Sequence, residues 1–189
     1  MGRTAKFGQD QILDAALAIT ADAGPGAATM GAVAARLGAQ TGSLYHRFGS
    51  RDLMLATLWI RTVRAFQRGF ADALAEGDAR GAALHTPRWC RRHPAEGALL
   101  VLHRRQELAA RWPDELGTDL DTLNAEVADA LDAFAARRPG VDRERLIFAT
   151  VDVPYGAVRR HLLARRPPPP LVDELITAAC DALLPPPAA

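Results

Sequence analysis

The sequence is poor in several kinds of residue, and each shortage excludes a class of protein. Its two cysteines, Cys90 and Cys180, lie far apart and lack the spacing of metal ligands. We therefore expect neither a disulfide framework nor a cysteine-rich metal centre. Two unpaired cysteines are consistent with a protein that works in a reducing compartment. No apolar run approaches the roughly 18 residues of a membrane span, and the N-terminus lacks the apolar run of a secretion signal. We expect a soluble cytoplasmic protein without a membrane partner.

Patterns typical of β-strands are also missing. Nowhere do apolar and polar residues alternate with the period of two that a half-buried strand requires. Apolar residues recur instead at intervals of three and four, between breaks at glycine and proline, as they do in amphipathic helices. The sequence therefore predicts an all-α protein of about nine helices.

An excess of charge of either sign is missing too. The chain has 23 basic and 22 acidic residues, a net charge of +1, and Lys6 is its only lysine. A balance this close to neutral excludes a polycation and by itself argues slightly against DNA binding. Residues 1–51, however, hold five basic and three acidic residues, so the basic excess lies at the N-terminus. With 49% hydrophobic residues, the chain can build a core.

The first short helix of a two-helix pattern is predicted over residues 30–37. Its apolar face repeats at i, i+3, i+4 and i+7 and consists of Met30, Val33, Ala34 and Leu37. Thr29 stands at the N-cap position, where its hydroxyl accepts from a backbone N–H that the first turn leaves unpaired. Gly38 follows the last apolar position, where a left-handed residue costs least.

The second short helix begins after only Ala39 and Gln40, and its apolar residues Leu44 and Phe48 are four apart. Two helices joined by so tight a turn are typical of the helix-turn-helix, whose second helix enters the major groove of DNA. We therefore interpret residues 29–53 as a DNA-reading element.

The run of residues 37–53, Leu-Gly-Ala-Gln-Thr-Gly-Ser-Leu-Tyr-His-Arg-Phe-Gly-Ser-Arg-Asp-Leu, resembles the core signature of the TetR family of bacterial transcriptional repressors. That signature has a glycine turn, a Tyr-x-x-Phe recognition helix and a basic residue that opens a long helix. The matching positions are Gly38, Tyr45, Phe48, Arg51 and Leu53. Two positions depart from it, since the family usually has lysine in place of Arg51 and a larger residue in place of Gly31. Beyond residue 60 the resemblance is one of architecture only.

The resemblance implies two domains. Residues 1–50 would form a three-helix, helix-turn-helix DNA-binding domain. Residues 51–189 would form a helical bundle for effector binding and dimerisation, with 51–76 as the linking helix. The helices outside the motif are predicted from the apolar spacing at 10–23, 51–76, 79–92, 94–111, 116–134, 146–165 and 171–184. Pro154 predicts a kink inside its helix, and Pro167 to Pro170 predict a stiff connector.

The expected DNA-contacting residues cluster around the start of the second short helix. They are Thr29, Gln40, Thr41, Gly42, Ser43, Tyr45, His46 and Arg51. Gln40 can pair with adenine, and Thr41 can contact a thymine methyl group or a phosphate, although Thr41 can equally act as a helix cap. The resemblance implies that Tyr45 and His46 meet phosphates or base edges, and that Arg51 clamps a phosphate. Leu44 and Phe48 are expected to face the core.

Catalytic and metal-binding alternatives find little support in the sequence. Ser43 and His46 lie one turn apart, but no third group orients the histidine and no glycine-x-serine-x-glycine motif surrounds the serine. The intervals between His85, His93 and His103 do not match a metal site. We expect no enzymatic activity, no catalytic residues, no metal and no cofactor.

The second domain is expected to hold a ligand cavity, since helix bundles build such sites between facing helices. The candidate lining residues are Trp59, Val63, Phe66, Trp89, Leu99, Leu102, His103, Gln106, Leu123 and Val127. For each of them, ordinary core packing is the competing interpretation. We expect an apolar or aromatic effector with one or two hydrogen-bond acceptors, while the arginines between 88 and 111 leave an anionic ligand open.

The last two helices resemble the pair that forms the two-fold interface of this family. The expected interface residues are Ile147, Val151, Tyr155, Val158, Leu162, Leu175 and Ile176. A homodimer would place two recognition helices about one DNA turn apart and would read a palindromic operator in double-stranded DNA.

The sequence thus favours a transcriptional regulator, a repressor that a small-molecule effector releases from its operator. Two alternatives stay open. One is a helical ligand-binding protein without DNA function, and the other is a regulator without a small effector.

Overall fold

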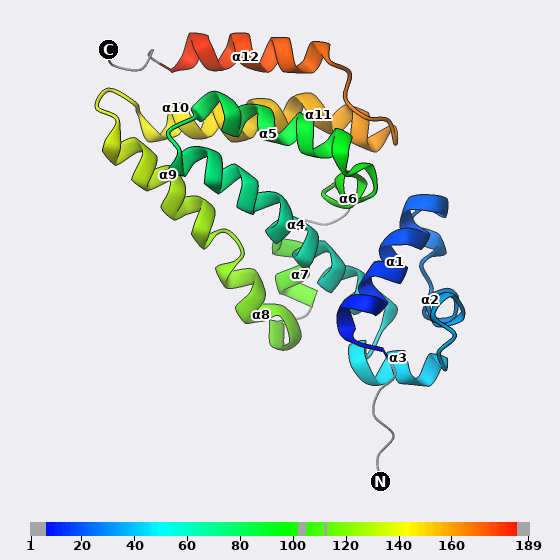
Figure 1. The fold of residues 1–189 in the computed structure, drawn as a ribbon. Helices are drawn as coiled ribbons and strands as arrows, with labels where there is room; N and C mark the ends of the chain where they lie inside the picture. The colour runs from blue at the N-terminus through cyan, green and yellow to red at the C-terminus, as the bar shows by residue number, and fades with distance from the viewer. Residues whose placement is uncertain (1–6, 102–104, 112, 185–189) are drawn as a thin grey trace.

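A computed structural model describes residues 7–101, 105–111 and 113–184 of the chain. Every regular element in these residues is helical, which confirms the all-α class. A small N-terminal domain and a larger bundle are joined by the long helix α4 (Arg51–Ala75) (Figure 1). Within these ranges no helix combines the length and the apolar character that a membrane span needs.

The N-terminal domain is built from three helices and one 3₁₀ turn. They are α1 (Gln9–Ala23), η1 (Pro25–Ala27), α2 (Met30–Leu37) and α3 (Thr41–Phe48). The predicted caps of α2 are confirmed, because the Thr29 hydroxyl accepts from the Ala32 N–H at 3.1 Å and Gly38 ends the helix at φ 62°. Glycine adopts that left-handed backbone without steric cost, and the chain can therefore turn at once into α3.

Helix α4 begins at a capped end, where the Ser50 hydroxyl accepts from the Leu53 N–H at 3.1 Å. Along its length it contributes to three hydrophobic clusters, which we call the N-terminal core, the lateral core and the main core. Its buried residues in them are Met54, Leu55 and Leu58 for the N-terminal core, Ala56, Trp59 and Ile60 for the lateral core, and Phe70 and Leu74 for the main core. One helix therefore ties the two domains together.

The bundle follows α4 in the chain. Its elements are α5 (Ala79–Arg92), α6 (Pro94–Leu99), α7 (Arg105–Arg111), α8 (Pro113–Thr122), α9 (Ala125–Arg137), α10 (Arg143–Ile147), the π-helical turn η2 (Phe148–Asp152), α11 (Val153–Leu163) and α12 (Leu171–Leu183). Helix α5 lies between α4 and α12, while α8 and α9 run along the other side of α4 (Figure 1). The short helix α6 lies between α5 and the N-terminal domain.

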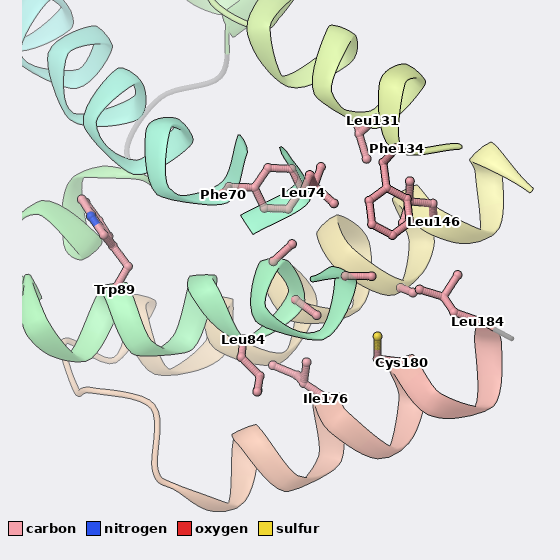
Figure 2. Close-up of a cluster of buried hydrophobic side chains, with 14 of the residues drawn as sticks. Phe70, Leu74, Leu84, Trp89, Leu131, Phe134, Leu146, Ile176, Cys180 and Leu184 are labelled. Atoms are coloured by element: carbon pink, nitrogen blue, oxygen red, sulfur yellow. The ribbon is translucent and has the colours of Figure 1, made fainter. Parts of the chain in front are cut away.

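The main core fills the bundle and takes side chains from six helices, α4, α5, α9, α10, α11 and α12, and from the turn η2. Figure 2 shows Phe70 and Leu74 of α4 facing Phe134 of α9 and Leu146 of α10, with Ile176 of α12 beneath α5. Burying a side chain of this size stabilises a fold by about 1.5–3 kcal/mol. The main core thus fixes the position of α9 to α12 against α4 and α5.

The predicted single helix over 116–134 is wrong, since the chain breaks between α8 and α9 at Leu123 and Asn124. The two halves serve different clusters: Leu116, Leu120 and Leu123 pack in the lateral core, whereas Leu131 and Phe134 pack in the main core. In one straight helix both sets of side chains would lie along the same helical face. The break at Leu123 and Asn124 therefore allows each half to pack against its own cluster.

The expected irregularity at Pro154 takes the form of the π-helical turn that precedes it. Proline lacks a backbone N–H and its ring crowds the carbonyl of the preceding turn. The wider turn of η2 relieves that crowding, and the Thr150 hydroxyl donates to the Leu146 carbonyl at 2.7 Å inside it. The chain therefore continues as α11 in a rotated register.

Candidate nucleic-acid interface and bundle cavity

Helix α3 presents one polar face to solvent. Leu44 and Phe48 are buried in the N-terminal core, so the opposite side of the helix carries the predicted DNA-contacting residues. All of the following are exposed: Gln40, Thr41, Gly42, Ser43, Tyr45 and His46. The Tyr45 side chain is 50% exposed, which is unusual for a large aromatic residue and leaves its ring and hydroxyl available to a partner.

At the start of α3, Gln40 and Thr41 leave their side chains out of the helix cap, whereas the Ser43 hydroxyl is already hydrogen-bonded. Gln40 is the N-cap residue, and among the described residues its amide makes no capping hydrogen bond. Thr41 is already the first helical residue, so it is not the cap that the sequence left open. The Ser43 hydroxyl donates to the Gln40 carbonyl at 2.7 Å. Thr29, in contrast, uses its hydroxyl to cap α2.

Arg51 lies differently from the phosphate clamp that the resemblance implied. Its Nη2 donates to the Pro25 carbonyl at 2.6 Å and its Nε donates to the Ala28 carbonyl at 3.1 Å. Both carbonyls belong to the turn between α1 and α2, where residues outside regular helix need partners for their backbone groups. The guanidinium therefore fastens the helix-turn-helix to the start of α4, and its phosphate contact stays a prediction.

A second arginine extends this contact into the bundle. Asp52 accepts from Arg51 Nη1 at 3.1 Å through Oδ1 and from Arg111 Nη2 of α7 at 2.7 Å through Oδ2. The carboxylate thus bridges one arginine that holds the α1–α2 turn and another that belongs to the bundle. The sequence did not indicate this pairing, because Asp52 and Arg111 are far apart in the chain.

A cavity of about 380 Å³, which we call the bundle cavity, lies between α4, α5, α9 and the η2–α11 segment. Its lining residues are Val63, Phe66, Gln67, Phe70, Thr86, Cys90, Leu100, Asn124, Val127, Ala128, Leu131, Arg143, Ile147, Thr150, Val151, Tyr155, Val158 and Leu162. Of the predicted pocket residues, the structure brings Val63, Phe66 and Val127 to this wall.

Other predicted pocket residues lie elsewhere. Trp59 and Leu123 are buried in the lateral core, and Leu99 is buried in the N-terminal core, because their helical faces point away from the cavity. Trp89 packs in the main core with its ring edge-on to Phe66, 5.4 Å between ring centres. Gln106 belongs to α7, while Leu102 and His103 fall outside the described residues.

The cavity wall takes instead several residues that were expected at the dimer interface. Ile147, Val151 and Tyr155 line it, and Val158 and Leu162 line it while also packing in the main core. The rotation of register at η2 turns these positions toward α4 and α5. Sequence spacing alone gives the face of a regular helix and could not show this rotation.

An aromatic row continues behind the cavity wall. His85 Nε2 lies 2.8 Å from the Phe66 carbonyl oxygen, and its ring centre is 5.0 Å from that of Phe66. Gly69 allows this approach, because a Cβ atom there would lie 2.5 Å from His85 Cε1. Burial lowers the pKa of His85, and the nearby positive charge of Arg92 adds to that effect. The ring is therefore held neutral, with Nε2 donating to the carbonyl.

Large apolar side chains are exposed on η2, α11 and α12. They are Phe148, Tyr155, Leu163, Leu171 and Leu175, each at least 44% exposed. Of the predicted interface residues, Tyr155 and Leu175 are among them, and Tyr155 also lines the bundle cavity. Val158, Leu162 and Ile176 are buried in the main core of the same chain, so their assignment to an interface is wrong.

Comparisons with known proteins agree with this architecture. Residues 12–58 match the model of the family described as bacterial regulatory proteins, tetR family. The crystal structure of multidrug binding protein EbrR complexed with imidazole is similar to the chain, with 20% identity, a TM-score of 0.62 and 100% of both chains covered. So is that of a TetR transcriptional regulator from Rhodococcus sp. RHA1, with 21% identity, a TM-score of 0.54, and 92% of this chain and 93% of that chain covered. No curated protein matches the chain.

A helix-turn-helix domain carried on a helical bundle defines the class of DNA-binding transcriptional regulators. At 20% and 21% identity the two solved structures show the fold alone. The family match covers the whole helix-turn-helix and the first turns of α4. Residues 12–58 therefore carry the helix-turn-helix of the tetR family of bacterial regulatory proteins.

The first prediction concerns Arg51. Replacing it by alanine removes its hydrogen bonds to the Pro25 and Ala28 carbonyls, so we expect Arg51→Ala to lower the free energy of unfolding by about 1–3 kcal/mol. Chemical denaturation measures this value, with Arg47→Ala on α3 as the control. Unchanged stability in Arg51→Ala would show that the guanidinium does not fasten the turn.

The second prediction concerns pH. The folded state lowers the pKa of His85, so the unfolded chain binds a proton more readily. The contribution of His85 to stability should be complete above its ordinary pKa of about 6.5 and should fall as the pH drops below it. Thermal unfolding measured at pH values across this range should show the loss of stability. The loss should be smaller in the variant His85→Gln. The control His46→Gln should lose as much stability as the parent protein. A loss in His85→Gln equal to that of the parent protein would contradict the prediction.

Proposed function

We propose that this protein is a homodimeric repressor that a small molecule releases from a palindromic operator. The observation that carries the proposal is the position of α6, which touches both the bundle cavity and the DNA-binding domain. Leu100, directly after α6, lines the cavity, and its neighbour Leu99 is buried in the N-terminal core. A displacement of Leu100 at the cavity wall would therefore also move the adjacent Leu99, which packs in the core of the DNA-binding domain.

The DNA-contacting surface in this proposal is the exposed face of α3. Gln40, Thr41, Gly42 and Ser43 lie at its start, where helix-turn-helix proteins read base edges. Tyr45 and His46 follow on the same exposed side and suit phosphate or base contacts. Arg51 and Thr29 support this surface by holding the α1–α2 turn and the first turn of α2.

The dimer contact in this proposal is the apolar face of α11 and α12. Two copies related by a two-fold axis would cover Tyr155, Leu163, Leu171 and Leu175 and leave the α3 helices free to reach one face of DNA. Operator half-sites would then be separated by about one helical turn of 34–36 Å, or by a multiple of it.

The release step follows from the contacts of α6 with α5 and α11. A Cβ atom on Gly97 would lie 3.4 Å from Cys90 Cα and 3.5 Å from Leu162 Cδ2, so α6 lies in van der Waals contact with both helices at this point. Cys90 and Leu162 also line the bundle cavity. A ligand that displaces either side chain moves α6 and, through Leu99, the DNA-binding domain.

A second contact would transmit the same movement. After α11, Arg165 lies against Gly24, whose Cβ position would be 2.4 Å from Arg165 Nη2. Gly24 ends α1, so the end of α11 touches the DNA-binding domain directly. The ligand can shift the equilibrium only by its difference in affinity for the two arrangements, typically 1–3 kcal/mol.

A regulator without a small effector is the competing function. A cavity of about 380 Å³ with a mostly apolar wall favours the effector, because small-molecule sites are commonly apolar clefts of about this size.

The third prediction tests the DNA surface. We expect the protein to bind the intergenic DNA beside its own gene far more tightly than scrambled DNA, and Tyr45→Ala to weaken this binding by about tenfold or more. Fluorescence anisotropy at one fixed salt concentration measures both affinities, since salt changes them strongly. Asp129→Ala, an exposed change on α9, is the control. Equal affinity for operator and scrambled DNA would refute the repressor function.

The fourth prediction tests the dimer. Leu175 is 55% exposed on α12, and Leu175→Glu would bury a carboxylate without a partner between two copies. Light scattering at micromolar concentration should give a dimer for the parent protein and for the control Ala136→Glu on α9. The variant Leu175→Glu should be a folded monomer. A dimeric Leu175→Glu would place the interface on another surface.

A further inference from the structure

The wall of the bundle cavity is almost without charge. Among the described residues that line it, none is acidic and Arg143 is the one charged side chain. The Arg143 guanidinium donates to Asp132 and lies 3.9 Å from Glu144, and neither carboxylate lines the cavity. Its positive charge is therefore already matched by two acidic neighbours outside.

The remaining wall is apolar or carries neutral polar groups. Burial raises the pKa of the Cys90 thiol to about 12, so this side chain is uncharged as well. A charged ligand entering such a cavity would lose part of its hydration without gaining an unpaired opposite charge, and that loss weakens its binding relative to a neutral ligand. The cavity therefore discriminates against both cations and anions.

One hydroxyl in the wall has no protein partner. Thr86 of α5 is only 5% exposed as a residue, and within the described part of the chain its hydroxyl makes no hydrogen bond, although the oxygen is not sealed from solvent. Thr150 on the opposite wall differs, since it donates to the Leu146 carbonyl at 2.7 Å. A hydroxyl that faces an open cavity without a protein partner bonds to water or to a ligand. A ligand can supply the partner that Thr86 lacks.

A pair of amides lies at the solvent-accessible edge of the same wall. Gln67 Nε2 of α4 donates to Asn124 Oδ1, just before α9, at 2.8 Å. This bond leaves one amide oxygen and one amide N–H₂ group side by side for a polar end of the ligand. Both groups are neutral, so they recognise a dipole and not a charge.

We infer that the effector is an uncharged, largely apolar molecule with a hydroxyl, carbonyl or amide group that pairs with Thr86. The Gln67–Asn124 pair would meet any second polar group at the edge of the cavity. This inference rests on the proposed function, because it assigns the chemistry of the ligand that would release the operator.

The test uses four probes that share one ring system and differ in charge. They are 2-naphthalenemethanol, 2-methylnaphthalene, 2-naphthoate and 2-naphthylmethylammonium. Each competes with the neutral dye N-phenyl-1-naphthylamine, whose fluorescence rises in an apolar site, on the full-length protein. We expect the dye to bind once per protomer, and the alcohol to displace it at a concentration about tenfold or more below that of either ion.

Two variants connect this binding to the cavity. Thr86→Val keeps the shape of the side chain and removes its hydroxyl. It should weaken binding of the alcohol about tenfold and leave binding of 2-methylnaphthalene unchanged. Ala128→Trp fills the cavity and should abolish dye binding, while Ala133→Trp, exposed on the same helix α9, should not.

The inference is overturned if either ion binds as tightly as the alcohol, if Thr86→Val binds the alcohol unchanged, or if the dye does not bind. Operator DNA binding is measured on the same preparations. Intact operator binding together with any of these outcomes would refute the ligand class alone. Loss of operator binding in the parent protein would refute the repressor function, whatever the probes show.

Discussion

The burial of α4 along its whole length is the constraint on which the rest of the structure depends. A helix of 25 residues is about 37 Å long, and isolated helices are only marginally stable in water. Its stability therefore comes from three clusters in succession: Met54 and Leu58 in the N-terminal core, Trp59 in the lateral core, and Phe70 and Leu74 in the main core. Because the same helix belongs to both domains, neither can rotate without disturbing a cluster of the other.

Because α4 is packed in both domains, the cavity beside it is in a position to affect both. The cavity lies beside α4 at Val63 and Phe66, between the turns that the N-terminal core and the main core hold. A ligand that fills this space favours whichever arrangement of the helices it fits. Leu99 and Leu100 then connect this wall to the DNA-binding domain. The proposed regulation needs no flexible linker, only a difference in packing between two arrangements.

Local signals in the sequence predicted the DNA-binding domain well. Thr29 and Gly38 occupy the cap positions that their chemistry requires, and Leu44 and Phe48 point inward as their spacing of four implies. The role of Arg51 was not predictable in this way. Its hydrogen bonds join α4 to carbonyls of Pro25 and Ala28, and nothing in the local pattern shows that a distant turn has unpaired acceptors.

The sequence by itself determined the helical class, the position of the helix-turn-helix and the inward face of each short helix, because periodicity, caps and glycine turns act within a few residues. Tertiary structure alone decided which helical faces meet. The break at Asn124 sends Leu123 and Leu131 to different clusters, and the π-helical turn before Pro154 moves Val158 and Leu162 from an expected interface to the core and the cavity wall. Both outcomes depend on packing between segments far apart in the chain, where a shift of one residue changes the face that a helix presents.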